Sequence, residues 1–286
     1  MNRLNNQQQT GTKQKKSFFR SNPVMNRLSK VNEFDTGEKA AGYGRITIKT
    51  AYFLLMTVVG MFVYLIMNST IFASQPQTIS FAYKNFVFNT STMQIGFFAG
   101  AAIIAIITQI LAAFVRSSIP VTGTIYSVCQ GFIISFIIFT VLGNGYSYLG
   151  LLALLITIVV VFSMALLYTK GIIKPNKKFH MIVITLFASM IGISILSFFG
   201  YLIPLTRPFV AAIMGNFWVS IGLTVISIIL ACLFLISDFA MIDYVVENKM
   251  PAKYEWMASF GLAFTVLWIY VKILDLLIQI VGNSKR

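Results

Sequence analysis

Acidic residues are scarce in this sequence and unevenly spread. Its 286 residues include only eight Asp and Glu, and none lies between Glu38 and Asp238. The gap ends inside an apolar run that begins at Phe217. A charge at bilayer depth costs about 2.5–3.5 kcal/mol on insertion scales, so intramembrane acids are rare and usually functional. Asp238 is therefore the first candidate for a functional residue.

Metal ligands and nucleophilic motifs are equally sparse. The chain has one histidine, His180, and two cysteines, Cys129 and Cys232. A lone His without a nearby carboxylate or Cys partner does not support a metal site or a catalytic triad. The sequence contains no HExxH, GxSxG or GxxxxGK motif. We expect no enzyme, no cofactor and no firm metal site, and we interpret the cysteines as small packing residues.

The bulk composition indicates a membrane protein. Apolar residues make up 57% of the chain, charged residues 10%, and the mean hydropathy is +0.82. A soluble domain of this length could not bury so much apolar surface. The apolar stretches are continuous rather than alternating, which favours helices over a barrel. We predict an all-α integral membrane protein.

Seven apolar stretches of about 20 residues or more predict a bundle of seven transmembrane helices. Residues 1–45 are polar and basic, and we expect them to form a disordered cytoplasmic tail. Residues 46–286 would form the transmembrane domain. Its predicted spans are 47–67, 94–115, 119–141, 147–168, 180–202, 217–245 and 256–281.

The basic residues indicate the orientation of the bundle. Ten of the 22 Lys and Arg residues precede residue 50, and 17 fall on the side of the N-terminus. Only four fall on the other side. This bias predicts a cytoplasmic N-terminus, an external C-terminus and a multi-pass protein of the plasma (inner) membrane. We attribute the net charge of +14 to lipid headgroups and topology. Nucleic acid is not expected as a partner, because no basic patch is interleaved with aromatic residues in a folded soluble unit.

Two further segments carry structural expectations. The outer loop 68–93 contains a half-alternating run at residues 79–88, which would lie along the interface or cap the bundle. The stretch Gly96-Phe-Phe-Ala-Gly100 fits the small-xxx-small pattern of close helix contacts. It predicts tight packing of the second span.

The last two spans hold the membrane-embedded charges. Asp238 lies about nine residues, or roughly 13 Å of helix rise, from the cytoplasmic end of its span, near the bilayer midplane. Asp243 lies closer to the cytoplasm and could line a vestibule leading to Asp238. Lys272 and Asp275 share one helix face in the outer half of the last span. They would form an outer-leaflet ion pair with a snorkelling lysine, or face an internal polar pathway together with Asp238.

The hairpin formed by these two spans fixes relative heights. With its turn near residue 250, the level of Asp238 on the last helix is Gly261–Phe264, and Lys272 stands roughly 13 Å higher. Direct pairing of Asp238 with Lys272 is therefore not expected. Other polar side chains that could reach Asp238 or bridge this distance are Arg116, Gln130 and Gln109.

A buried carboxyl group holds its proton to higher pH than an exposed one, and a nearby cation opposes this effect. Such a group can change its charge near neutral pH and switch a local contact. This is the physical basis for a pH-gated cation leak.

The sequence resembles the Bax inhibitor-1 (YccA-like) membrane family, in the bacterial branch with a long N-terminal tail. The resemblance covers roughly residues 20–281. It rests on these stretches, taken in order: Arg20-Ser-Asn-Pro-Val-Met-Asn-Arg27, Ile48-Lys-Thr-Ala-Tyr-Phe-Leu-Leu, Pro120-Val-Thr-Gly-Thr-Ile-Tyr-Ser-Val-Cys-Gln-Gly131, Asp238-Phe-Ala-Met-Ile-Asp243, Pro251-Ala-Lys-Tyr-Glu-Trp256 and Leu267-Trp-Ile-Tyr-Val-Lys-Ile-Leu.

The resemblance implies a seven-helix fold with one central helix. For some members it also implies a pH-sensitive Ca²⁺ leak that depends on two carboxylates from the last two helices. Asp238 matches the first acid, whereas Lys272 stands where relatives have the second, and Asp275 follows one turn later. Ca²⁺ would be a permeant ion rather than a cofactor. Other relatives regulate membrane proteases or stress survival, so the alternative is a non-conducting regulatory protein that binds other membrane proteins.

Overall fold

The computed structural model describes residues 40–77, 79–83, 86–143, 145–173 and 175–284. The expectation of disorder for residues 1–45 therefore falls almost wholly outside the described residues. Its last part, from Ala40 onward, is described and belongs to the folded domain.

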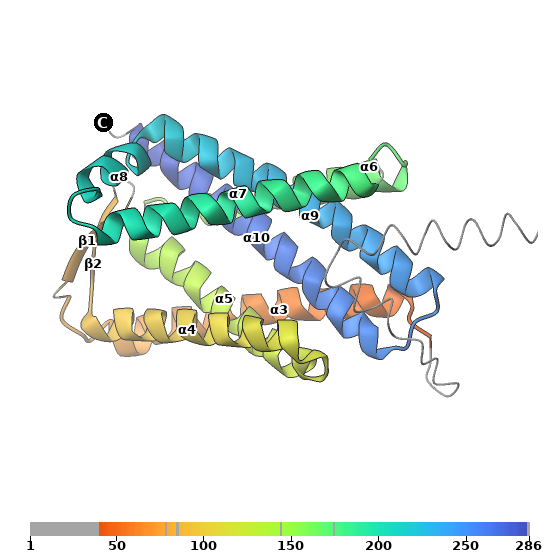
Figure 1. Ribbon diagram of the computed structural model, residues 1–286. Coiled ribbons are helices and arrows are strands. Elements are labelled where there is room, and N and C mark those ends of the chain that lie inside the picture. Colours follow the sequence, from red (N-terminus) through yellow and green to blue (C-terminus); the bar gives the residue numbers. More distant parts are fainter. Residues whose placement is uncertain (1–39, 78, 84–85, 144, 174, 285–286) are drawn as a thin grey trace, which may run out of the picture.

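Within the described residues, seven helical stretches are long and apolar enough to cross a membrane, which confirms the predicted helical bundle. Short helices η3 (Arg116–Ser118) and α8 (Arg207–Met214) connect some of them (Figure 1). The seven stretches are α3 (Tyr43–Met67) extended by the π-helical turn η2 (Asn68–Phe72), α4 (Thr92–Phe114), α5 (Ile119–Phe136) extended by the π-helical turn η4 (Ile137–Val141), α6 (Tyr148–Thr169), α7 (Lys177–Leu202), α9 (Phe217–Glu247) and α10 (Lys253–Asn283).

Helix α3 begins at Tyr43 rather than at the predicted residue 47. Gly42, in an extended conformation, is its N-cap. The first turns carry Arg45 and Lys49, so hydropathy alone assigns part of them to a polar tail. The helix begins earlier than predicted because these basic side chains have a partner on α10, described below. The other helices begin and end within about three residues of the predicted bounds.

The bundle has two ends, which we name by what lies there (Figure 1). The tail end contains Ala40, the start of α3 and the α4–α5, α6–α7 and α9–α10 turns. The hairpin end contains a two-stranded sheet, α8 and the last turns of α10. Strands β1 (Ile79–Tyr83) and β2 (Phe86–Thr90) form this antiparallel hairpin.

The hairpin corresponds to the half-alternating run at residues 79–88. Phe81 pairs with Phe88, and their rings stack at 6.0 Å between centroids. Phe86 is buried, and its ring packs edge-on against Tyr146 at 5.3 Å. The hairpin therefore caps one end of the bundle and adds a small β element to the predicted helical fold.

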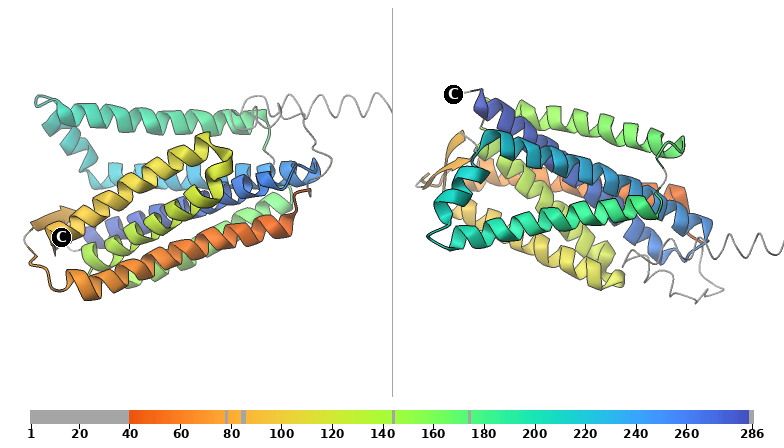
Figure 2. Two further views of the ribbon diagram at one scale, coloured as in Figure 1. Left: turned by 90° about the horizontal axis from the view of Figure 1, so that it is seen from below. Right: turned by 45° about the horizontal axis from the view of Figure 1, so that its top comes forward.

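Helix α10 occupies the centre of the bundle. It contacts α3, α5, α6 and α9, and its residues Ile269, Ile273 and Leu274 belong to the largest buried cluster. This agrees with the central helix implied by the family resemblance. Helix α7, by contrast, buries only His180 and Val183 and runs along the outside (Figure 2).

The closest helix contact lies between α3 and α5. A Cβ atom at Gly60 would stand 2.0 Å from the carbonyl oxygen of Val128, and one at Gly131 only 1.9 Å from that of Thr57. Only glycine permits this approach of two backbones. The two helices therefore form a rigid crossing in the middle of the bundle.

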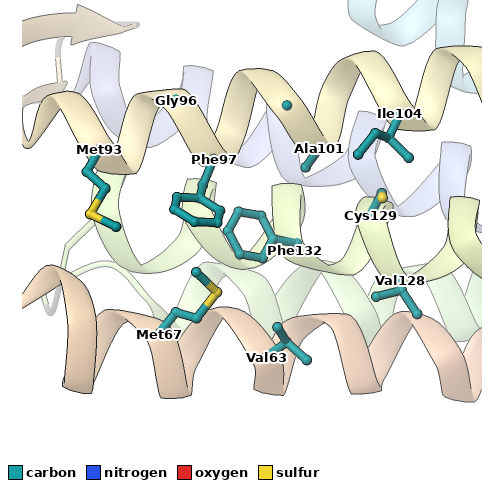
Figure 3. Close-up of a pocket in the computed structure, with 11 residues that line it drawn as sticks. Val63, Met67, Met93, Gly96, Phe97, Ala101, Ile104, Val128, Cys129 and Phe132 are labelled. Atoms are coloured by element: carbon teal, nitrogen blue, oxygen red, sulfur yellow. The ribbon is translucent and has the colours of Figure 1, made fainter.

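The predicted contact through Gly96 and Gly100 is wrong. A Cβ atom at either position would meet nothing within 4 Å. Both glycines line an open apolar groove of about 570 Å³ between α3, α4 and α5 (Figure 3). The spacing was right for a contact, but this face of α4 points to the groove rather than to a neighbouring helix.

Candidate functional site

Asp238 lies on the face of α9 that meets α10. Its Oδ1 atom would be 3.7 Å from a Cβ atom at Gly261, and the Thr265 side chain is its hydrogen-bonding neighbour. The predicted level on α10 was Gly261–Phe264, so the register of the α9–α10 hairpin is confirmed. The turn between the two helices indeed centres on Met250.

The second carboxyl oxygen of Asp238 is unsatisfied. Oδ2 is buried and has no hydrogen-bond partner among the described residues. Burying a polar oxygen without a partner is costly, and burying a charged one costs more. A proton or a bound cation would relieve that cost. Asp238 is thus a buried carboxyl group with one unsatisfied oxygen.

Three polar partners were suggested for Asp238. The guanidinium of Arg116 stands over the Tyr254 ring at the tail end, 5.9 Å from its centroid. Gln109 and Gln130 are half-buried on α4 and α5. The hydrogen-bonding neighbour that the structure gives Asp238 is Thr265 of α10, and a role for the three suggested partners stays a prediction.

Asp243 joins three helices at the tail end. The Tyr43 hydroxyl of α3 donates to Oδ1 at 3.1 Å, and the Tyr168 hydroxyl of α6 donates to Oδ2 at 2.5 Å. Both oxygens of the carboxylate are therefore engaged. Asp243 fastens α3 and α6 to α9 in this structure, below the level of Asp238.

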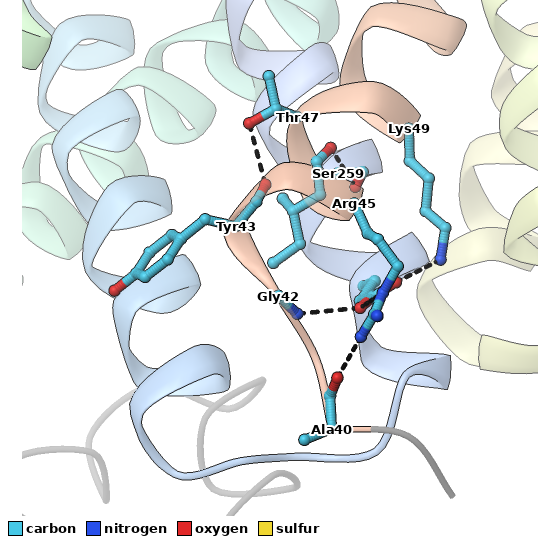
Figure 4. Close-up of polar contacts among 9 residues, drawn as sticks. Ala40, Gly42, Tyr43, Arg45, Thr47, Lys49 and Ser259 are labelled. Carbon is cyan, nitrogen blue, oxygen red and sulfur yellow. Dashed lines mark hydrogen bonds and ion pairs between the residues drawn. The ribbon is translucent and has the colours of Figure 1, made fainter.

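Glu255 forms the strongest polar cluster of the tail end, and sequence reasoning missed it. Its side chain is fully buried and receives Arg45 Nε at 2.6 Å, Lys49 Nζ at 2.7 Å and the Gly42 backbone N–H at 3.0 Å (Figure 4). These are charge-assisted hydrogen bonds. They tie the first turns of α3 to the first turn of α10.

Two kinds of signal could have pointed to Glu255. It follows Pro251 in a family motif, and two basic residues lie in the first two turns of the first helix. However, Arg45 and Lys49 are 210 and 206 residues away in sequence. Their charges were therefore counted only toward topology.

Further contacts close the tail end. The Ala41 backbone N–H donates to the Met250 carbonyl at 2.8 Å, and the Ser259 hydroxyl donates to the Ile46 carbonyl at 2.9 Å. Together with Asp243 and Glu255, they hold α3 against the α9–α10 hairpin.

Lys272 and Asp275 line a cavity of about 370 Å³ at the hairpin end, between β2, α4, α5 with η4, and α10. Thr224 on α9 donates to Asp275 at 3.4 Å and accepts from Gln279 at 2.8 Å. Both charged residues line this cavity, and a polar pathway that they share with Asp238 stays a prediction. Asp238 does not line this cavity, which agrees with the expected separation from Lys272.

Gln94 is a second polar centre that sequence reasoning missed. It is buried at the start of α4, and its amide nitrogen donates to Tyr64, Asn68 and Thr140 at 2.9–3.2 Å. Thr90 donates to its carbonyl oxygen at 2.8 Å. We call this uncharged cluster the Gln94 hub. It joins η2 and η4, and π-helical turns of this kind are frequent at functional sites.

No group of three or more His, Cys, Asp or Glu within the described ranges could hold a metal ion. Cys129 and Cys232 are free thiols, half-buried among apolar neighbours.

Comparison with known proteins gives one family. A family model described as "Bax inhibitor 1 like" matches residues 22–282, which covers all seven helices that could cross a membrane except the last residue of α10. No curated protein and no solved structure matches the chain.

Proposed function

The chain belongs to the Bax inhibitor 1 like family, and from this premise we propose that it is a pH-sensitive cation leak with Asp238 as the buried sensor. Ca²⁺ is the proposed permeant ion. The observation that carries the proposal is the unsatisfied Oδ2 atom of Asp238 between α9 and α10. A buried carboxyl group without a hydrogen-bond partner can gain or lose a proton or cation, and this change in charge can shift the conformation of the protein.

The surroundings of Asp238 support a closed state. On the tail side, Asp243 and Glu255 hold α3 against α9 and α10 through Tyr43, Arg45 and Lys49. On the other side lies the cavity that Lys272 and Asp275 line. A cation path would run from that cavity past Asp238, and its tail side opens when α3 separates from the α9–α10 hairpin.

We propose that the tail end faces the cytoplasm and that the protein lies in the plasma (inner) membrane. The described basic residues support this orientation, because most lie at the tail end: Arg45, Lys49, Arg116, Lys170, Lys177, Lys178, Lys249 and Lys253. Arg207 lies at the hairpin end. Basic residues accumulate on the cytoplasmic side of membrane proteins.

Ion flux into proteoliposomes between pH 5 and pH 8 tests the proposal. We expect Ca²⁺ flux to change with pH in the wild type and to lose most of this dependence in Asp238→Asn, whose side chain cannot titrate. Glu247→Gln is the matched control, since it makes the same change at an exposed position of the same helix. This variant should keep the wild-type profile.

Two results would contradict the proposal. Absence of Ca²⁺ and monovalent flux at every pH would exclude a leak. An unchanged pH profile in Asp238→Asn would exclude Asp238 as the sensor while leaving the conduction itself intact.

A second candidate function is a non-conducting regulator that binds other membrane proteins, such as a protease or a stress-response component. Lys272 favours it, because a lysine lining the hairpin-end cavity repels cations. This candidate predicts no flux in wild type or variants. It also predicts that membrane-protein partners co-purify with the full chain and are lost when residues 1–39 are removed.

A further inference from the structure

The cavity lined by Lys272 and Asp275 has the size and the walls of a ligand pocket. It has a volume of about 370 Å³, and its described lining residues come from β2, α4, α5 with η4, and α10. Nine of these residues are apolar, and the other two are Lys272 and Asp275. Pockets for small molecules typically have volumes of about 300–1,000 Å³ and apolar walls with a few polar groups. We call this feature the Lys272 cavity.

Aromatic rings from three elements form part of its wall. Phe88 of β2, Phe98 of α4 and Phe136 of α5 all line the Lys272 cavity. The ring centroids of Phe98 and Phe136 are 4.5 Å apart, and those of Phe88 and Phe136 are 6.4 Å apart. Aliphatic side chains supply the rest of the apolar lining. A hydrocarbon chain is therefore the kind of group that these walls would hold, since burial against them removes apolar surface from water.

Lys272 brings a positive charge to these apolar walls. Its side chain is half-buried, and it makes no hydrogen bond or ion pair with any residue in the described part of the chain. A charge against apolar surface is costly unless an opposite charge accompanies it. Ionisable residues inside membrane-spanning helices are accordingly rare and usually functional. A bound anion would supply the missing partner of the Lys272 ammonium.

Asp275 restricts which anion the cavity can accept. Its Oδ2 atom accepts a hydrogen bond from the Thr224 hydroxyl at 3.4 Å. Thr224 belongs to α9, which contributes no described residue to the cavity lining. A second negative charge on the ligand would be repelled by the Asp275 carboxylate, because like charges repel at short range. The cavity is therefore suited to a single negative charge placed at Lys272.

From these observations we propose that the Lys272 cavity binds a fatty-acid anion. The Lys272 ammonium donates to the carboxylate head, and the chain lies among the phenylalanine and aliphatic side chains. A carboxylate carries one negative charge, whereas a phosphate monoester carries about 1.5 to 2 at neutral pH and would be repelled by Asp275. This inference goes beyond the proposed leak and does not rest on it, because the cavity can be occupied whether or not ions are conducted.

Native mass spectrometry of the full chain in a non-ionic detergent tests the proposal with four probes that share one hydrocarbon chain. The probes are dodecanoate, dodecyl phosphate, dodecanol and dodecylammonium, at a mildly alkaline pH that keeps the carboxylate ionised. We expect dodecanoate to bind the wild type most tightly, with a Kd at least about tenfold below that of dodecanol, because hydrogen bonds to charged groups are the strong ones.

Substitutions at Lys272 separate its charge from the shape of the cavity. Lys272→Gln should abolish the preference for dodecanoate over dodecanol, whereas Lys272→Arg should keep it. Dodecanol binding should persist in Lys272→Gln, which shows that the variant is folded and that its apolar walls are intact. Lys253→Gln is the matched control, since it makes the same change at an exposed position of the same helix that does not line the cavity. It should keep the preference of the wild type.

Three results would overturn the proposal. The first is equal binding of dodecanoate to Lys272→Gln and to the wild type. The second is equal binding of dodecanol and dodecanoate to the wild type, which is partition of the chain without recognition of the head. The third is tighter binding of dodecylammonium or dodecyl phosphate than of dodecanoate. Absence of ion flux in proteoliposomes would contradict the leak and leave this inference standing.

Discussion

The two ends of the bundle differ in how their polar side chains are bound. At the tail end, hydrogen-bond donors contact buried or half-buried carboxylates directly. Glu255 binds Arg45 and Lys49, and Asp243 accepts from two tyrosine hydroxyls. At the hairpin end, the neutral Gln94 hub joins the helices. The charged pair Lys272 and Asp275 there lines a cavity.

The comparison distinguishes charged groups that hold helices together from charged groups that line a cavity. A fully buried carboxylate with three donors has no remaining capacity for a ligand, so Glu255 acts as a structural fastener. Lys272 and Asp275, by contrast, line a cavity of about 370 Å³. Asp238 differs from both, since its side chain is buried but one of its two carboxyl oxygens has no hydrogen-bond partner among the described residues.

Removal of the tail-end fastener should have the largest effect on stability. Glu255→Gln leaves Arg45 and Lys49 without their carboxylate, and breaking a buried pair costs about 3–5 kcal/mol. Arg45 is partly exposed and can regain water, so we expect a loss of about 3 kcal/mol in the free energy of unfolding.

Denaturation in detergent measures this loss, and exposed Lys178→Gln serves as the control, with an expected change within about 0.5 kcal/mol. If Glu255→Gln were as mild as the control, the tail end would not be held by its charges, and the contrast between the two ends would disappear.

The crossing between the ends should be the next most sensitive position. Gly131→Ala places a Cβ atom against the Thr57 carbonyl, and the backbones must separate. We expect a destabilisation of about 2–3 kcal/mol in the same unfolding assay.

Gly96→Ala is the matched control on α4, where the added methyl group meets nothing. It should be neutral or stabilise the helix by about 0.5–1 kcal/mol. Equal effects of the two substitutions would show that the α3–α5 approach is not tight.

The neutral hub should give the smallest effect. Gln94→Leu leaves the hydrogen-bonding groups of Thr90, Tyr64 and Thr140 without their central partner. An unsatisfied buried group costs about 1–3 kcal/mol, and the hydroxyls can partly repair the loss among themselves, so we expect about 1–2 kcal/mol.

Gln109→Leu makes the same change at a half-buried position of the same helix and should fall within about 0.5 kcal/mol. A loss for Gln94→Leu as large as that for Glu255→Gln would mean that charge gives the tail end no special strength.

Much of this architecture follows from hydropathy and helix geometry. The seven spans and the level of Asp238 beside Gly261 were predictable, because a short turn fixes the register of an antiparallel helix pair. The clusters around Glu255 and Gln94 were not predictable. Their members lie on helices far apart in the sequence, and nothing in their spacing selects a partner.

The sequence by itself determined that the chain forms seven helices long and apolar enough to cross a membrane. Hydrocarbon favours helices because it tolerates no unpaired backbone polar groups. The tertiary structure decided which helix faces meet. Lipid solvates an apolar face as well as another helix does, so the sequence pattern alone did not choose Gly60 and Gly131 over Gly96 and Gly100. The shapes of the helix surfaces and the pairing of polar groups determined which faces pack together. In the resulting arrangement, one carboxyl oxygen of Asp238 has no hydrogen-bond partner within the described part of the chain.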